Sequence, residues 1–370
     1  MSNLIKHRSV HSARLERWLG KDKIAELSGH MKGWYAGPIH LIDCPGSVRV
    51  CKDGDFVGPF ERGVFMSAMD SLESMVKRAM KMPKYSFNIG FTSISDALSR
   101  GSGGFSRKLP FNKAGPTGVV AVTTSLHKVG AQPVAGAAGA AAPGGTAFVD
   151  SDTGGFTFDN PAAGSYRLTG ADVVSDRVSC LLLYDRIFSV AKTPSSVATE
   201  AVTGDPLRYQ STTATAEDFI GGNFGFIEIG TAALGATAHN WTVCLYEDHA
   251  AASSTLPTVT GNSAGIAHRL DQPASTWFVP LASGDQGIRA WTQMQNSASV
   301  TGAVDFCIGH PLGFMTLPLI NGWFPFDWLT NRDQAPRIFA DAYLAFLDLT
   351  KVATNATNFN GVLYMTSTSS

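Results

Sequence analysis

A serine with the spacing of a hydrolase nucleophile lies late in the chain. Residues 261–265 read Gly-Asn-Ser-Ala-Gly and match the G-x-S-x-G pattern, in which the serine hydroxyl attacks an ester or amide carbonyl. That chemistry needs a buried strand before the serine and a helix after it, because the sharp turn between them exposes the hydroxyl. Here a polar run at 253–257 precedes Ser263 and a short run at 266–268 follows. The pattern favours a polar loop between strands, with a serine hydrolase using Ser263 as an alternative.

An acidic segment at residues 150–155 (Asp-Ser-Asp-Thr-Gly-Gly) is similar to the opening of a calcium-binding loop. Such a loop places an oxygen ligand at its fifth position and a glutamate at its twelfth. This chain has Gly154 and Pro161 at those positions. The segment therefore predicts an ordinary turn, with a weak ion site between subunits as the alternative.

A second group of polar residues, Glu247, Asp248 and His249, directly follows an expected strand. Adjacent residues at a strand end point in opposite directions, so three in a row rarely converge on one atom. His268, His310 and Asp305 lie among other expected strands without the spacing of metal ligands. The sequence thus predicts no catalytic, cofactor-binding or metal-binding residue.

The five cysteines indicate thiols rather than disulfides. They are odd in number, none forms a C-x-x-C pair, and most lie in apolar runs (Cys44, Cys51, Cys180, Cys244 and Cys307). The N-terminus lacks the apolar core of a signal peptide, and no run approaches the roughly 18 apolar residues of a membrane span. We therefore expect folding in a reducing cytoplasm and no membrane partner.

The composition changes near Pro110. Residues 1–110 contain 17 Lys and Arg against 10 Asp and Glu, whereas residues 111–370 contain 12 against 20 and include four lysines. A basic block can contact packaged DNA or the acidic surface of a neighbouring subunit, and a solvated helix face is the simpler alternative. Only 16% of all residues are charged, well below the usual quarter. Such a chain is expected to cover part of its surface with other subunits.

Residues 1–110 show helical spacing and one small hairpin. Short helices are expected at 12–20 and 21–31, and the clearest helix runs over 61–82, where apolar residues recur with a 3.6-residue period and Pro83 ends the helix. Between them, 46–51 and 56–57 read as an extended pair around the Asp53-Gly54 turn. A linker is expected at the glycine-rich residues 101–104.

Residues 111–370 read as a long antiparallel β region. Short apolar runs are separated by Gly, Pro, Asp and Asn, and no alternating helices are present that would build a parallel sheet. The expected strands are 119–122, 156–158, 166–168, 178–184, 224–229, 241–246, 276–281, 288–295, 303–308, 342–349 and 361–365. Residues 131–145 are mostly Ala, Gly and Pro, and we expect an arm that becomes ordered against another subunit, because such residues bury little apolar area alone.

Several segments resemble structural proteins of tailed bacteriophage virions, of the capsid-shell or head-decoration type. They are 7–9, 14–20, 53–56, 113–118, 182–188, 203–210 and 278–289, and residues 359–364 are similar to the last strand of trimeric jelly-roll domains. The resemblance covers most of the chain without selecting one family, and it implies no catalytic residues.

These observations combine into one expectation. The fold is α+β: residues 1–110 form a mainly helical, basic region, and 111–370 form a large β-sandwich of jelly-roll type, with an HK97-like capsid shell fold as the alternative. The expected function is a non-enzymatic component of a bacteriophage virion that forms or decorates the capsid by homo-oligomeric contacts with itself and other virion proteins. A receptor-binding jelly-roll protein of the tail is a further alternative. Assembly is expected in the host cytoplasm.

Overall fold

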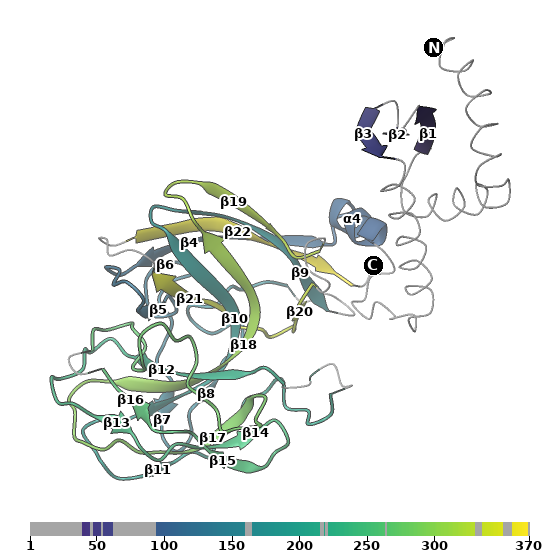
Figure 1. Cartoon of the computed structure of the whole chain (residues 1–370). Helices are drawn as coiled ribbons and strands as arrows, with labels where there is room; N and C mark the ends of the chain where they lie inside the picture. The colour runs from purple at the N-terminus through teal and green to yellow at the C-terminus, as the bar shows by residue number, and fades with distance from the viewer. Residues whose placement is uncertain are drawn as a thin grey trace. The chain divides into compact units, whose positions relative to one another are not determined.

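The structure of the protein is a computed structural model that describes residues 39–44, 47–52, 55–61, 94–159, 165–214, 218, 221–262, 265–329, 335–350 and 357–368. The chain divides into two compact units, Met1–Ser86 and Phe87–Ser370 (Figure 1). The helices expected at 12–20 and 21–31 lie outside the described residues. So does the one expected at 61–82, except for Glu61.

The described part of the first unit is a three-stranded antiparallel sheet. It contains β1 (Ile39–Cys44), β2 (Ser47–Lys52) and β3 (Asp55–Glu61), in the order β1-β2-β3. Lys52 of β2 pairs with Asp55 of β3, which leaves two residues for the connection. The hairpin predicted around Asp53-Gly54 is confirmed, and Glu61 ends a strand where a helix was expected to begin.

The second unit begins with helix α4 (Ile94–Ser102) and strand β4 (Ser106–Gly115). Arg100 Nε lies 2.9 Å from Asp96 Oδ1, one helical turn away, and Gly104 adopts the left-handed conformation (φ 90°) just past the helix end. In β4, alternate residues from Leu109 to Gly115 are buried. The domain boundary expected at Pro110 falls inside this strand, so residues 106–110 belong to the sheet.

The second unit is built from mostly antiparallel sheets, and α4 is the one helix among its described residues. The first sheet contains β19 (Trp323–Asp327), β9 (Tyr166–Ser175), β22 (Thr357–Ser367), β4 and β6 (Ala131–Gln132), with β20 (Arg337–Ile338) paired to β9. The second contains β12 (Phe224–Ile229), β18 (Val304–Leu317), β10 (Ser179–Lys192), β21 (Leu344–Thr350) and β5 (Thr123–Ser125), with β7 (Ala140–Ala141) and β8 (Thr146–Ala147) paired to β10.

These two sheets enclose the first hydrophobic core, as in a β-sandwich. One sheet contributes alternate residues such as Leu109, Val173 and Leu363, and the other contributes Leu183 and Phe346, among others. Alternation arises because successive side chains of a strand point to opposite faces. The antiparallel sandwich predicted for residues 111–370 is therefore observed.

Strands β10 and β18 are each 14 residues long and extend past this sandwich (Figure 1). Beyond irregularities in their pairing near Tyr184 and Phe188, they cover a second core. Its other wall consists of β11 (Glu200–Ala201), β17 (Ile288–Met294), β14 (Leu245–Asp248) and β15 (Ser253–Thr255), together with β13 (Asn240–Trp241) and β16 (Val259–Thr260). A third core, with Phe148, Tyr184, Phe226 and Tyr343, completes the burial of the seven-stranded sheet.

Most strands lie where the sequence predicts them. The strand expected at 224–229 is β12, and the runs at 178–184, 288–295, 303–308, 342–349 and 361–365 fall on β10, β17, β18, β21 and β22. The strands expected at 119–122, 156–158 and 276–281 are wrong, because all three segments lie outside the strands. Phe156, Phe158 and Val279 are nonetheless buried. These apolar residues lie in irregular segments that pack onto the cores.

The Ala/Gly-rich segment 131–145 lies on its own domain, where the sequence suggested an arm that another subunit orders. It pairs through β6 with β4 and through β7 with β10, and Gly136 N donates to His127 O. A Cβ on Gly136 would overlap the His127 ring, and one on Gly139 would overlap the Ser189 carbonyl. Gly136 and Gly139 are therefore explained by close approach to neighbouring parts of the same chain.

We predict that Gly139→Ala destabilises the protein by about 1–3 kcal/mol, because the added methyl must displace the backbone of buried β10. Gly144→Ala is the matched control, since nothing lies within 4 Å of a Cβ there. Urea denaturation of both variants measures the difference. Equal stability of the two variants would contradict the packing described here.

Candidate functional site

Ser263 lies outside the described residues, but its surroundings do not form a strand-turn-helix elbow. The strand before it, β16, has two residues, and residues 267–270 form a turn and β-bridges. A buried His–Asp pair stands on either side of Ser263 in the sequence. His239 Nε2 lies 2.8 Å from Asp271 Oδ2. The other ring nitrogen, Nδ1, lies 3.2 Å from Thr237 O. Both nitrogens of His239 are thus engaged, and neither is left to accept a serine proton.

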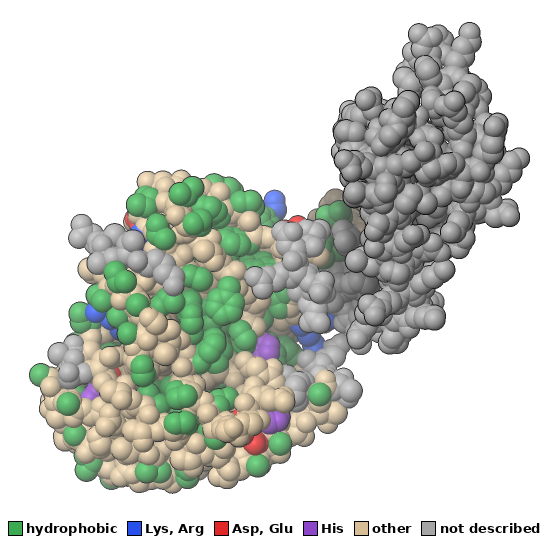
Figure 2. Space-filling model, viewed as in Figure 1, with side chains coloured by type: hydrophobic (Ala, Val, Ile, Leu, Met, Phe, Trp, Pro, Cys, Tyr) green, Lys and Arg blue, Asp and Glu red, His purple; other side chains and the backbone are tan. Residues whose placement is uncertain are grey.

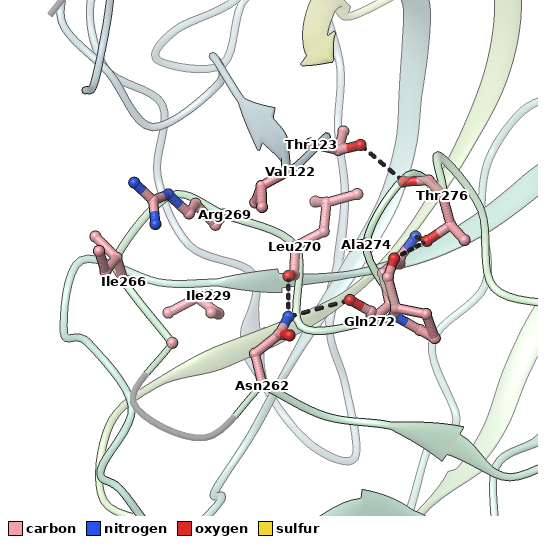
Figure 3. Close-up of a pocket in the computed structure, with 12 residues that line it drawn as sticks. Val122, Thr123, Ile229, Asn262, Ile266, Arg269, Leu270, Gln272, Ala274 and Thr276 are labelled. Carbon is pink, nitrogen blue, oxygen red and sulfur yellow. Dashed lines mark hydrogen bonds between the residues drawn. The ribbon is translucent and has the colours of Figure 1, made fainter. Parts of the chain in front are cut away.

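A hollow of about 180 Å³ lies beside this segment, with Val122, Ile229 and Leu270 among its apolar lining residues (Figure 3). The polar lining groups are bonded to one another. Asn262 Nδ2 donates to Leu270 O at 2.8 Å and to Gln272 O at 3.1 Å, and Gln272 Nε2 lies 2.9 Å from Thr276 Oγ1. The hollow therefore combines apolar walls with polar groups that hold the loop together.

The acidic motifs resolve into local structure. Asp152 Oδ2 accepts from Val149 N at 2.9 Å, which closes the turn predicted at 150–155. Asp248 Oδ1 accepts from Ala250 N and Ala252 N, both at 2.8 Å.

The neighbours of Asp248 have partners elsewhere. Glu247 Oε2 lies 2.8 Å from Arg289 Nη1, and His249 Nδ1 accepts from Gln286 N. Within the described residues, no three His, Cys, Asp or Glu side chains gather as a metal site would require.

The structure instead brings together four buried charges that no motif singled out. Arg186 of β10, Glu228 of β12 and Asp305 of β18 lie on neighbouring strands, and Lys128 follows β5. Arg186 Nη2 lies 2.8 Å from Glu228 Oε2. Lys128 Nζ contacts Asp305 Oδ2 and lies 3.9 Å from Glu228 Oε2. All four side chains are at most 2% exposed. We refer to these residues as the charge network.

The electrostatics of the charge network follow from burial and charge balance. Burial disfavours the charged form of Glu228, but the charges of Arg186 and Lys128 outweigh it and hold the pKa of Glu228 well below its usual range. Burial raises the pKa of Asp305, and the Glu228 charge adds to this rise. The neighbouring His127 has a pKa lowered to about 3 by burial and by the Arg186 charge. His127 is therefore neutral at physiological pH.

Other charges are also neutralised inside the fold. Arg208 forms two bonds to Asp185, Nη2 to Oδ1 at 2.6 Å and Nε to Oδ2 at 2.9 Å. Arg177 contacts Asp348. Among the described residues, six Lys or Arg and six Asp or Glu are buried. The described interior therefore contains equal numbers of basic and acidic residues, so the acidic excess of residues 111–370 lies outside the core.

The few lysines of residues 111–370 hold loops in place through buried hydrogen bonds. Lys113 Nζ donates to Val129 O at 2.9 Å and Pro133 O at 2.8 Å. Lys192 Nζ donates to Ser196 O at 2.9 Å and to Glu200 Oε1 at 2.7 Å. Together with Lys128, these are three of the four lysines beyond residue 110, and all three are buried.

The exterior consequently carries few charges and several large apolar side chains. Figure 2 shows a face of the second unit on which hydrophobic and uncharged side chains predominate. Three of the apolar residues lie together in the chain between β18 and the start of β19, where Leu319, Ile320 and Trp323 are 57–63% exposed. We refer to these three residues as the apolar β18–β19 connection.

The sequence contained a signal for the buried charges that motif searching missed. Asp185 and Arg186 interrupt an otherwise apolar run, residues 181–190, which forms a strand buried along most of its length. Charged residues are rarely fully buried unless paired. A charge inside a strand of this kind therefore predicts a buried partner, although only the tertiary structure identifies Arg208 and Glu228.

Comparisons with known proteins assign no family. No protein-family model matches the chain, and no curated protein sequence does. Among solved structures, VP2 in the subviral particle of infectious bursal disease virus is 10% identical over 71% of this chain and 80% of that chain, with a TM-score of 0.16. The Gt strain of the same virus gives 10% identity over the same shares and a TM-score of 0.15. TM-scores at this level do not establish a common fold.

Two further observations concern cysteines and membranes. Cys244 and Cys307 are buried free thiols, as the sequence predicts, and burial raises the pKa of Cys244 to about 12. No helix in the described part of the chain is long and apolar enough to cross a membrane.

We predict that Arg186→Met destabilises the protein by about 3–5 kcal/mol, because it leaves Glu228 buried with less compensation. The double variant Arg186→Met/Glu228→Gln removes both charges, so its loss should be smaller than the sum of the losses in the two single variants. Urea denaturation of the two single variants and the double variant measures the coupling. Additive effects would contradict the pairing.

Acid should weaken the fold through His127. Its folded pKa of about 3 lies below its unfolded value of 6.5, so the unfolded chain binds the proton first. Stability is then lost as pH falls from 6.5 toward 3, by about 1.4 kcal/mol per pH unit for this residue. The free energy of unfolding should fall less between pH 7 and pH 5 in His127→Gln than in the wild type. Parallel pH profiles would contradict this assignment.

Proposed function

We propose that the protein is a non-enzymatic structural component of a bacteriophage virion, with residues 87–370 forming a jelly-roll-type sandwich that packs against copies of itself. The observation that carries the proposal is the distribution of charge. Charged residues inside the fold are paired or bonded to backbone groups, and the described lysines beyond residue 110 are all buried. Lysine and glutamate are depleted from protein interfaces, where aromatic residues are enriched.

The apolar β18–β19 connection supports self-association. Leu319, Ile320 and Trp323 are exposed together between β18 and β19. Exposed apolar groups gathered on one surface mark contacts with other molecules more often than isolated ones do. A second copy of the chain, with the same low density of surface charge, is a partner of matching chemistry. Other virion proteins are further partners in this proposal.

The charge asymmetry supplies a second source of attraction. Residues 1–110 carry seven more basic than acidic residues, and residues 111–370 carry eight more acidic than basic ones. Head-to-tail contact would bring the basic region of one subunit to the acidic sandwich of the next. Contact of the basic region with packaged DNA is the alternative use of the same charge. The proposed location is the virion, after assembly in the host cytoplasm.

Light scattering of the purified full-length protein tests self-association. Large species are expected at low salt and should diminish as salt rises, because exposed charges are screened beyond about 8–10 Å. Trp323→Glu should reduce assembly further by placing a charge in the apolar β18–β19 connection. Val197→Glu, at an exposed position in another loop, is the matched control. A monomer at high concentration and low salt would refute the proposal.

A further inference from the structure

Three members of the charge network form an arrangement that can make a covalent bond. An amine, Lys128 Nζ, contacts the carboxyl group of Asp305, and a second carboxylate oxygen, Glu228 Oε2, lies 3.9 Å from the same nitrogen. The three groups come from the segment after β5, from β18 and from β12. Side-chain exposure is 2% for Lys128, 2% for Asp305 and 0% for Glu228.

We propose that Lys128 and Asp305 condense within the folded chain to form an amide crosslink, with Glu228 as the group that transfers the proton. This inference concerns the interior of the domain and does not depend on the proposed function.

The reaction balances without a cofactor or an oxidant. Proton transfer inside the ion pair gives a neutral amine on Lys128 and a carboxylic acid on Asp305. The amine nitrogen attacks Cγ of Asp305, and the Glu228 carboxylate accepts a proton from that nitrogen. Glu228 returns the proton to the departing hydroxyl group, which leaves as water. One N–C bond forms and one C–O bond breaks, so the product is an amide and one water molecule.

Burial disfavours the charged forms of both reactants, although the Glu228 and Asp305 charges raise the pKa of Lys128 above its usual value. Arg186 bonds Glu228 at 2.8 Å and lies over the rings of Phe148 and Phe226, at 5.2 and 5.8 Å. A buried ion pair loses its hydration, which lowers the cost of returning the proton to the acid. Burial also raises the pKa of Asp305, which favours the carboxylic acid form. Asp305 Oδ1 has no hydrogen-bond partner among the described residues.

The backbone holds the two carboxyl groups in place before any reaction. Glu228 and Asp305 are directly opposite each other in the β12–β18 pairing. Opposed residues of neighbouring antiparallel strands have Cβ atoms about 4.5–5.5 Å apart. Reacting groups held at contact distance gain rate because no diffusion or reorientation is needed.

The other buried lysines lack this arrangement. Lys113 Nζ donates to backbone carbonyl groups, which are not electrophiles for condensation of this type. Lys192 contacts Glu200, but the described residues place no second carboxylate within 4 Å of Lys192 Nζ, and the Glu200 side chain is 21% exposed. Lys192 is therefore a suitable control within the same chain.

The bond would tie the segment after β5 to the long strand β18 and close a loop of the chain between residues 128 and 305. A crosslink of this length restricts the unfolded chain far more than the folded one. The folded protein should therefore resist unfolding more than its noncovalent contacts alone would allow.

Mass spectrometry of the purified, folded full-length protein tests the bond. The expected intact mass after denaturation is lower than that of the sequence by one water molecule. A tryptic digest should contain a branched peptide that joins the Lys128 and Asp305 segments, and cleavage after Lys128 should be lost. Recovery of unmodified Lys128 and Asp305 peptides, or a water loss located at another residue, overturns the proposal.

Variants assign the roles. Asp305→Ala and Glu228→Gln should each have the mass calculated from its own sequence, without loss of water. Lys192→Arg should still be lighter than its sequence by one water molecule. A branched peptide that forms as completely in Glu228→Gln as in the wild type overturns the role of Glu228. The wild-type digest decides the existence of the bond even where a variant fails to fold.

Discussion

Two acidic side chains, Glu228 and Asp305, lie directly opposite each other on adjacent buried strands. Like charges in opposed positions destabilise a sheet, and burial removes the water that would otherwise screen them. The pairing of β12 with β18 therefore requires two cations. Arg186 comes from β10, and Lys128 comes from the segment after β5. The pairing of β12 with β18 thus depends on the position of the segment after β5, because that segment supplies one of the two cations.

The same requirement extends to the Ala/Gly-rich segment. His127 precedes Lys128, and its Nε2 lies 2.9 Å from Ala137 O. Small residues let the backbone of this segment approach His127 and β10 closely, so that it covers the region beside the charge network. A segment that looks featureless by composition therefore has a defined packing role, because its lack of side chains allows the contact.

Charges in the interior have a consequence for the exterior. Residues 111–370 use half of their twelve basic residues in buried pairs and loop contacts and have few left for the surface. The charges that remain on the surface are sparse and mostly acidic, and exposed apolar groups such as Trp323 and Ile320 are not surrounded by a dense layer of charge. Strands β10 and β18 contribute to both main cores, so the two halves of the second unit share a continuous sheet. A sparsely charged surface and a shared sheet are both suited to a subunit that must pack closely and keep its shape.

Local patterns in the sequence determined the antiparallel β character of residues 111–370, the position of β12 and the hairpin between β2 and β3. Alternating apolar residues and turn residues act over a few positions, so they are legible without knowledge of the fold. Other features depend on residues far apart in the chain. Phe156 and Val279 lie in apolar runs that are buried without forming strands, and the partners of Asp185 and Arg186 are distant in sequence. The tertiary structure alone decided these features, because a buried charge is stabilised by whichever opposite charge the fold brings within bonding distance.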